Sequence, residues 1–303
     1  MTIDNHPNPP GAGLRRAVGW PVLVLTVLGL AILLNRNWSD FVAAFRGANW
    51  VLLALAALTL TVGHGLSALL SSRLSEAAGE PVPVSTAFRI LSIGGLAKYV
   101  PGGVWEFASR YGLGKAAGMN FRESLGLWLQ PMLLLLTVSG VWACFAAAFV
   151  GYELPGWVFL AAGAVFIGLS TPGPRAWLSA RMGIPSKPPG TAGTWIISLV
   201  IASAGVLLSA GHGLLVLQAI EPNSGIGLVG AIAAFVGSWV LGFIVLPIPG
   251  GFGIREGALV IALSPWLSPG PAIAVAAASR IASITSDLVA AAIALPTGMT
   301  RDE

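Results

Sequence analysis

Six long apolar runs follow one another along this sequence, and each is long enough to cross a lipid bilayer as an α-helix. Only 9% of the 303 residues are charged, against about 25% in an ordinary soluble domain. Too few polar groups are present to cover a surface that faces water, so a water-soluble globular fold is excluded. We predict an all-α polytopic membrane protein with six full spans, at residues 17–34, 50–70, 125–150, 155–171, 195–220 and 271–295.

Two further apolar stretches are interrupted near their middle. Residues 84–110 contain Pro101-Gly102-Gly103, and residues 232–263 contain Pro249-Gly250-Gly251. Proline removes a helix hydrogen bond and glycine readily leaves the helical conformation, so neither stretch can form one continuous helix. We predict two re-entrant hairpins, each of which enters the membrane and returns to its own side.

The two interruptions coincide when the sequence is shifted along itself by 148 residues. The same shift places Gly63-His64-Gly65-Leu66 on Gly211-His212-Gly213-Leu214. Histidine occurs only three times in the chain, so a second match that includes it is hard to attribute to chance. We therefore interpret the chain as an internal duplication.

Each half contains three spans and one hairpin, and an odd number of crossings inverts the second half relative to the first. This is the arrangement of transporters built from inverted-topology repeats. The predicted organisation is a cytoplasmic N-terminal tail (1–16), a first repeat (17–150, hairpin 84–110), a second repeat (151–296, hairpin 232–263) and a C-terminal tail (297–303).

The distribution of basic residues supports this topology. With a cytoplasmic N-terminus, nine lysines and arginines fall in cytoplasmic segments and two in outside loops, as the positive-inside rule requires. We expect Arg89 and Lys98 to extend along the first hairpin to the inner interface. The bases at membrane depth or in the hairpins need a separate explanation: Arg89, Lys98, Arg110, Arg255 and Arg280.

Opposite charges follow each hairpin break. Glu106 and Arg110 are four residues apart and can pair on one face of a helix. Arg255 and Glu256 supply a base and an acid after the second break. A charge at the centre of a spanning helix costs about 3 kcal/mol on insertion scales, so such residues usually face a cavity or a partner.

The breaks have the chemistry of an anion site. Gly102-Gly103 and Gly250-Gly251 let the backbone approach a ligand closely, and the helix after each break offers free N–H groups and a positive dipole end. We expect Arg255 to be the principal anion ligand, and Glu256 either to orient Arg255 or to sense its occupancy. In the alternative reading, glycine and proline only permit the bend and the charges only neutralise one another.

Three further groups lie inside predicted spans. Arg280 and Asp287 are two helical turns apart and share a face, either as part of a substrate or proton path or as an interhelical pair. His64 and His212 each lie between glycines, which predicts close helix contact there. Each is either hydrogen-bonded at the repeat interface or a proton relay. Two histidines and a single cysteine, Cys144, do not predict a metal site or a disulfide.

The blocks Lys98-Tyr99-Val100-Pro101-Gly102-Gly103-Val104-Trp105 and Pro249-Gly250-Gly251-Phe252-Gly253-Ile254-Arg255-Glu256-Gly257 resemble the lysylphosphatidylglycerol synthase transmembrane region family of flippase-like membrane proteins. The resemblance covers essentially the whole chain and implies translocation of a lipid between leaflets. Aminoacyl transfer is not expected, because in bifunctional members it belongs to a soluble domain that this sequence lacks. The residues expected to bind substrate are Lys98, Tyr99, Gly102, Gly103, Trp105, Glu106, Arg110, Gly250, Gly251, Arg255, Glu256, Arg280 and Asp287.

The expected function is a flippase-like transporter that moves an anionic lipid, a phospholipid or a polyprenyl-phosphate carrier, through a midplane site between the hairpins. We expect it in the plasma membrane of a prokaryote, with both termini cytoplasmic and a lipid-synthesising enzyme as a possible partner. Two alternatives stay open: a non-transporting accessory subunit of an envelope glycolipid pathway, and a membrane-embedded transferase. No Walker or GxSxG motif and no basic stripe is present, so we expect no enzyme activity, no cofactor and no nucleic acid.

Overall fold

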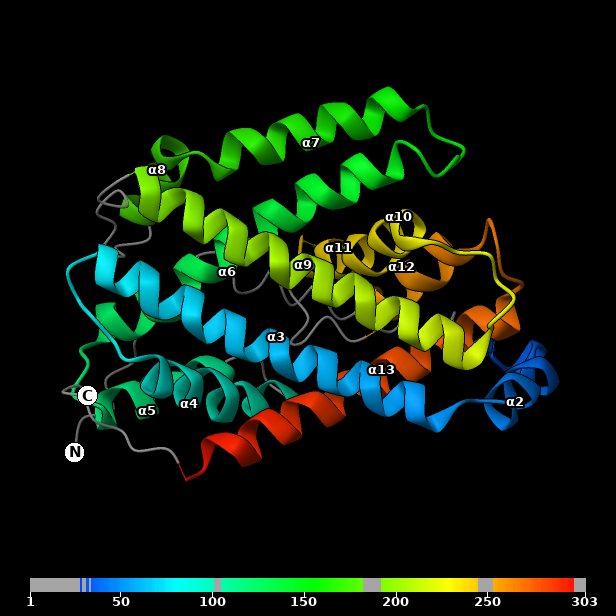
Figure 1. Cartoon of the computed structure of the whole chain (residues 1–303), viewed down its shortest axis with the longest axis horizontal. Coiled ribbons are helices and arrows are strands. Elements are labelled where there is room, and N and C mark those ends of the chain that lie inside the picture. The colour runs from blue at the N-terminus through cyan, green and yellow to red at the C-terminus, as the bar shows by residue number, and fades with distance from the viewer. Residues whose placement is uncertain are drawn as a thin grey trace, which may run out of the picture.

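Helices account for the secondary structure of the chain, and no strand occurs among the described residues (Figure 1). The structure is a computed structural model that describes residues 28, 31–32, 34–100, 105–181, 192–244 and 253–296. Both predicted tails, most of the predicted span at 17–34, and the two Pro-Gly-Gly breaks lie outside these residues. The elements are α2 (Trp38–Arg46), α3 (Trp50–Ala77), α4 (Val84–Gly95), η1 (Leu96–Tyr99), α5 (Trp105–Ala116), α6 (Phe121–Ala147), α7 (Gly156–Ser170), α8 (Pro172–Arg181), α9 (Ala192–Ile220), α10 (Leu228–Ala231), the π-helical η2 (Ile232–Val236), α11 (Gly237–Ile244), α12 (Ile254–Leu263) and α13 (Pro269–Ala294).

Four helices are long and apolar enough to cross a membrane: α3, α6, α9 and α13, of 26 to 29 residues each. At 1.5 Å per residue they are at least about 39 Å long, more than the roughly 30 Å of a hydrocarbon core. These four confirm the spans predicted at 50–70, 125–150, 195–220 and 271–295. The described residues therefore form an all-helical structure with four candidate membrane spans.

The span predicted at 155–171 is wrong in length. Helix α7 has 15 residues, or about 22 Å, and is too short to cross the hydrocarbon core upright. Pro155 precedes it as the N-cap, and Thr171 ends it in an extended conformation immediately before Pro172. The residue before a proline is driven away from the helical region, so α7 ends at Ser170 and the chain continues into the separate helix α8.

Asparagine side chains fix the starts of two spanning helices. The Asn49 side chain accepts hydrogen bonds from the backbone N–H groups of Val51 and Leu52 at the start of α3. Asn120 and Glu123 form a reciprocal capping box at the start of α6. These bonds satisfy N–H groups that have no partner within the helix, so each polar cap places a helix start that apolar periodicity alone leaves open.

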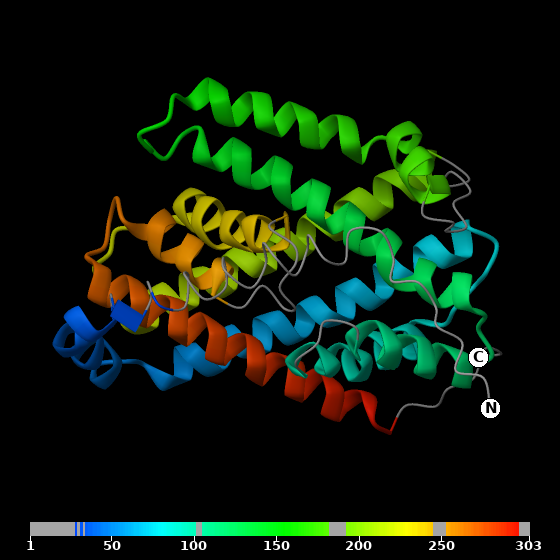
Figure 2. The same ribbon diagram turned by 180° about the vertical axis from the view of Figure 1, so that it is seen from behind.

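The four long helices run obliquely along the molecule, with α3 and α9 side by side and in opposite directions (Figures 1 and 2). Helices α6 and α13 also run opposite to each other. Alanine dominates the buried core where α3, α9, α12 and α13 meet, around the fully buried Phe235 and Leu263. Small side chains let helix backbones approach closely in a membrane, where packing must replace the hydrophobic effect.

Helix bounds in the two halves correspond at the 148-residue offset. Shifted by 148, α4 falls at 232–243 and α6 at 269–295, and the observed helices there are Ile232–Ile244 (η2 with α11) and Pro269–Ala294. The same shift carries α3 to 198–225 and α5 to 253–264, where α9 and α12 lie. The order of these four elements is the same in both halves. The bounds of α5 and α6 agree with their counterparts to within one residue, whereas α9 begins six residues and ends five residues before the shifted α3, and the segment that corresponds to α4 begins at Leu228.

Each predicted hairpin is a pair of helices packed against each other, α4 with α5 and α11 with α12. The pair α4 and α5 lies at the end of the molecule where α3 ends and α6 begins, whereas α10, α11 and α12 lie toward the opposite end (Figure 1). The predicted bounds need two corrections. The first segment continues to Ala116 instead of residue 110, and the second begins at Leu228 instead of residue 232. Both extensions are further helical turns.

Candidate functional site

Helix α13 carries two charged side chains on its inner face, near the middle of the protein. Arg280 lies eleven residues after Pro269 and fourteen before Ala294, and Asp287 lies two turns further on. Asp287 is 7% exposed. Their seven-residue spacing places Arg280 and Asp287 on one face of α13, but their ion-pair partners differ.

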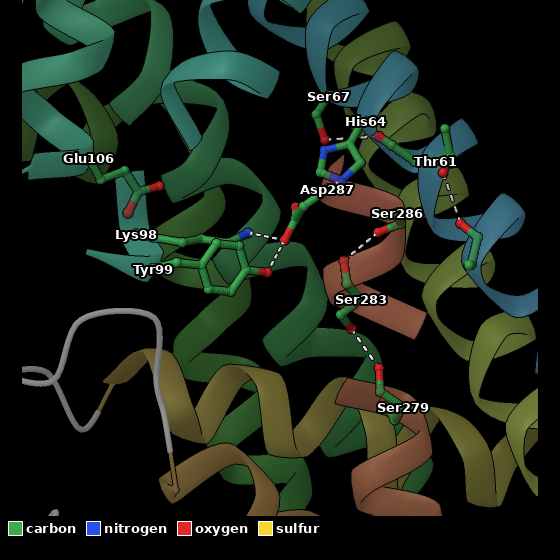
Figure 3. A network of polar contacts seen from close by, with 12 residues as sticks. Thr61, His64, Ser67, Lys98, Tyr99, Glu106, Ser279, Ser283, Ser286 and Asp287 are labelled. Atoms are coloured by element: carbon green, nitrogen blue, oxygen red, sulfur yellow. Dashed lines mark hydrogen bonds and ion pairs between the residues drawn. The ribbon is translucent and has the colours of Figure 1, made fainter. Parts of the chain in front are cut away.

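Asp287 is the centre of a polar network (Figure 3). Its Oδ2 atom lies 2.7 Å from Lys98 Nζ and accepts a hydrogen bond from the Tyr99 hydroxyl. Its Oδ1 atom lies 3.2 Å from His64 Nε2. One carboxylate thus holds three groups that come from α3 and η1, both in the other half of the chain.

The local backbone explains how these groups reach Asp287. Lys98 and Tyr99 occupy the single 3-10 turn η1 that follows α4, and Val100 is already extended. A 3-10 turn rises faster than an α-helix and changes the direction of its side chains, so it presents both residues to α13. His64 lies fourteen residues after Trp50 and thirteen before Ala77, at the middle of α3.

A second carboxylate pairs with Arg280. Glu256 Oε1 lies 3.4 Å from Arg280 Nη1, and Glu256 Oε2 accepts a 2.7 Å hydrogen bond from the backbone N–H of Gly253. Gly253 has φ of 82°, a conformation that glycine adopts without strain, and it starts α12. Glu256 therefore makes its direct contacts with Arg280 and with the backbone of Gly253, and it interacts with Arg255 electrostatically.

Arg255 has no carboxylate partner in the part of the chain that the structure describes. It packs against α11, where a Cβ added to Gly242 would lie 3.0 Å from Arg255 Cβ. Asp287, Arg280 and Glu256 are all close enough to interact with it electrostatically. The ion pairs Arg255–Glu256 and Arg255–Asp287, which the structural reading required, are absent from these residues.

The Tyr99 ring lies near one cation of each ion pair, Lys98 of the pair with Asp287 and Arg280 of the pair with Glu256. Its ring centroid lies 5.3 Å from Lys98 Nζ and 5.9 Å from Arg280 Cζ, within the range of cation–π attraction. We call the connected set the interior charge cluster: His64, Lys98, Tyr99, Arg255, Glu256, Arg280 and Asp287.

The predicted pair of Glu106 and Arg110 is confirmed, with Arg110 Nη2 2.8 Å from Glu106 Oε1. Arg110 also makes a cation–π contact, with its Cζ atom 4.9 Å from the Trp128 ring centroid. It fills the space above Gly94 of α4, where an added Cβ would lie 2.5 Å from Arg110 Cγ. Gly94 is therefore required for α4 and α5 to pack closely.

Charges in the interior charge cluster do not balance. Lys98, Arg255 and Arg280 are three cations, whereas Glu256 and Asp287 are two carboxylates, so the cluster carries one excess positive charge when His64 is neutral. Arg110 and Glu106 cancel each other and leave this excess unchanged. An uncompensated charge is costly at membrane depth, so the cluster favours an additional anion.

His64 and His212 differ although their sequence motifs match. His212 is fully buried, with Nε2 3.2 Å from the Ser279 hydroxyl and Nδ1 3.2 Å from the Ser209 carbonyl oxygen. Glycine at position 213 is needed for close packing, because an added Cβ would lie 2.6 Å from the Phe235 ring. Nothing lies within 4 Å of a Cβ added at Gly63 or Gly65, so the expectation of close contact there is wrong.

Two expectations for the first hairpin also change. Arg89 hydrogen-bonds the carbonyl oxygens of Ala294 and Leu295 at 3.2 and 2.6 Å, and thereby binds the end of α13. Lys98 forms an ion pair with Asp287 in the interior and does not extend to the inner membrane interface. Trp105 is 51% exposed, as a residue lining a lipid-accessible surface would be.

The structure brings together most of the described residues predicted as a site, and the sequence prediction left out one member. His64 was not among the predicted substrate-binding residues, although its place in the repeated motif singled it out. Gly102, Gly103, Gly250 and Gly251 lie outside the described residues. No group of three or more metal-ligating side chains occurs in the described ranges.

No protein-family model matches this chain, and no curated protein matches it.

Proposed function

We propose that this protein is a flippase-like transporter that moves an anionic lipid between leaflets through a site at the middle of the membrane. The observation that carries the proposal is the interior charge cluster, in which three cations face two carboxylates at mid-helix depth. A lipid phosphate would supply the missing negative charge. A phospholipid and a polyprenyl-phosphate carrier share this chemistry.

Arg255 is the side chain best suited to hold the phosphate. A guanidinium stays charged in a low-dielectric site and presents a planar fork that can donate to two phosphate oxygens. It lies two residues after Gly253, at the start of α12, where backbone N–H groups and the helix dipole add to the attraction for an anion. Lys98 Nζ lies 5.3 Å from the Tyr99 ring centroid, and Lys98 would be the second cation to contact the lipid.

The proposed transport path requires two inverted repeats with re-entrant hairpins that meet at the midplane. The antiparallel course of α3 and α9 supports this arrangement, as does the shared order of helices at the 148-residue offset. In this proposal the protein lies in a prokaryotic plasma membrane with cytoplasmic termini. It acts on a lipid that a separate enzyme makes and performs no transfer reaction itself, as its resemblance to the flippase-like family implies.

Cysteine labelling tests the inverted arrangement. With Cys144→Ser removing the single native cysteine, Ala116→Cys and Pro265→Cys place one thiol at the outer end of each broken segment. We expect a membrane-impermeant maleimide to label them from opposite sides of intact cells or oriented vesicles. Labelling of both thiols from the same side would show that the segments do not enter from opposite faces.

Reconstitution tests the function itself. We expect liposomes that contain the purified protein to lose more than half of a fluorescent phosphatidylglycerol signal on external dithionite, because inner-leaflet lipid becomes accessible. Protein-free liposomes should lose about half, and a polyprenyl phosphate probe with a zwitterionic control identifies the headgroup. Protein that leaves every anionic lipid in its leaflet contradicts the proposal and favours an accessory subunit; protein that transfers an aminoacyl or sugar group unaided favours a transferase.

A further inference from the structure

The two halves of the chain carry the same Gly-His-Gly-Leu motif in different electrostatic surroundings. His212 is fully buried, and within the described residues its ring lies against a serine hydroxyl, a backbone carbonyl oxygen and the Phe235 ring. The charged group that interacts with it electrostatically is the cation Arg255. His64 has 28% of its side chain exposed and faces the Asp287 carboxylate at 3.2 Å. Only the first histidine combines access from outside the core with a group that stabilises a positive charge.

Imidazole is the side chain whose ordinary pKa places its change of charge between about pH 5 and 8. His64 is also placed to act on the rest of the interior charge cluster. It contacts Oδ1 of Asp287, whereas Lys98 and Tyr99 contact Oδ2 of the same carboxylate. A change of charge on His64 therefore alters how strongly Asp287 holds Lys98.

We propose that His64 is a proton-binding site coupled to lipid binding, so that a proton on His64 and an anionic headgroup at Arg255 and Lys98 stabilise each other. This inference rests on the proposed function and specifies its regulation by pH. His212, in the second half, serves packing alone.

The coupling follows from charge. Neutral His64 donates its Nε2 hydrogen to Asp287, and a proton taken from water then forms the N–H bond at Nδ1. Asp287 now neutralises two cations, so its hold on Lys98 weakens and the excess positive charge of the cluster rises from one to two. Both changes favour a lipid anion. By linkage, the anion favours the proton to the same extent.

Other charged groups around α3 set the background for this site. Helix α13 brings Asp287 and Arg280, and Arg255 and Glu256 lie beyond them on α12. Hairpin α4–α5 contributes Lys98 and Tyr99 from η1, together with the paired Glu106 and Arg110, of which Arg110 interacts electrostatically with Asp287. The remaining ionisable groups on described helices packed against α3 are Arg89 on α4, Arg122, Glu123 and Cys144 on α6, and His212 on α9.

The first test measures binding of dihexanoyl phosphatidylglycerol to the purified full-length protein by calorimetry, because a phosphodiester keeps its charge across this range. Between pH 8 and pH 5.5 we expect the affinity of the wild-type protein to rise roughly tenfold, a typical coupling strength. His64→Gln can still donate a hydrogen bond to Asp287 but cannot titrate, so its affinity should not depend on pH. His212→Gln is the matched control and should keep the wild-type slope.

The second test does not depend on lipid. In a His6→Gln, His212→Gln protein labelled with ¹⁵N-histidine, His64 is the one remaining histidine, and its NMR signals should titrate between about pH 5 and 8. A His64 that does not titrate there overturns the inference. Lipid binding with the same affinity at both pH values, or a His64→Gln protein that keeps the wild-type slope, contradicts the coupling alone. A titrating His64 in a protein that binds no anionic lipid contradicts the proposed function, and the coupling with it.

Discussion

Replacing Asp287 with alanine is expected to lower the free energy of unfolding by about 3 to 5 kcal/mol, because it removes a buried carboxylate and leaves the partly buried Lys98 without its counter-ion. The substitution also removes the acceptor for the Tyr99 hydroxyl and the partner of His64. Unfolding in mixed micelles with increasing sodium dodecyl sulfate measures the change. Glu153→Ala, at an exposed loop position, is the matched control and should stay within about 0.5 kcal/mol of the wild-type protein.

A double replacement separates the effect of the unpaired Lys98 charge from the effect of lost side-chain volume at position 287. Asp287→Leu with Lys98→Met removes both charges and keeps apolar volume, so much of the lost stability should return. If Asp287→Ala unfolds like the wild-type protein, the carboxylate does not organise the interior. If the double variant is no more stable than Asp287→Ala, loss of side-chain volume and not the unpaired lysine explains the defect.

Arg255→Lys is expected to fold normally but to bind dihexanoyl phosphatidylglycerol about 10-fold to 150-fold more weakly. Loss of one charge-assisted hydrogen bond costs about 1.5 to 3 kcal/mol, and each 1.4 kcal/mol is tenfold in affinity. Stability should be preserved, because Arg255 has no carboxylate partner among the described residues to leave unpaired. This contrast with Asp287→Ala distinguishes a ligand-binding charge from a structural one.

Binding and thermal stability are measured on the same purified proteins, with the exposed Arg46 on α2 as the control position. Arg46→Lys should change neither quantity. Arg255→Lys protein that binds the lipid as tightly as wild type would refute the role of Arg255. A charge exchange between Arg280 and Glu256 is the corresponding test of a structural pair, and we expect it to restore stability because those two side chains contact each other.

The sequence alone determined the features that depend on neighbours along the chain. Apolar runs predicted six spanning helices, and four of them are confirmed, since a helix in lipid must be apolar over its whole length. The four-residue spacing predicted the Glu106–Arg110 pair, because residues i and i+4 meet on any helix. The order of α3, α4, α5 and α6 recurs at the 148-residue offset in α9, in η2 with α11, in α12 and in α13.

The sequence predicted the lengths of some helices poorly, because backbone breaks and apolar limits do not coincide. Hydropathy counts residues 155–171 as one apolar run, but the extended Thr171 before Pro172 ends α7 after 15 residues. Conversely, the helical turns that extend the two broken segments to Ala116 and from Leu228 lie beyond the apolar stretches that sequence reading delimited. Apolar character and helical conformation are set by different forces, so their limits need not coincide.

Only the tertiary structure decided which charges meet. Asp287 accepts from Tyr99, 188 residues away in the chain, and binds Lys98 and His64 beside it. Sequence placed Arg280 and Asp287 on one face of α13 and allowed several partners for each. The choice follows from helix packing: side chains can pair only where two backbones approach within their reach, and small residues determine where that occurs. The same packing left Arg255 without a carboxylate partner among the described residues and placed a carboxylate beside His64, whereas the charge near His212 is that of Arg255.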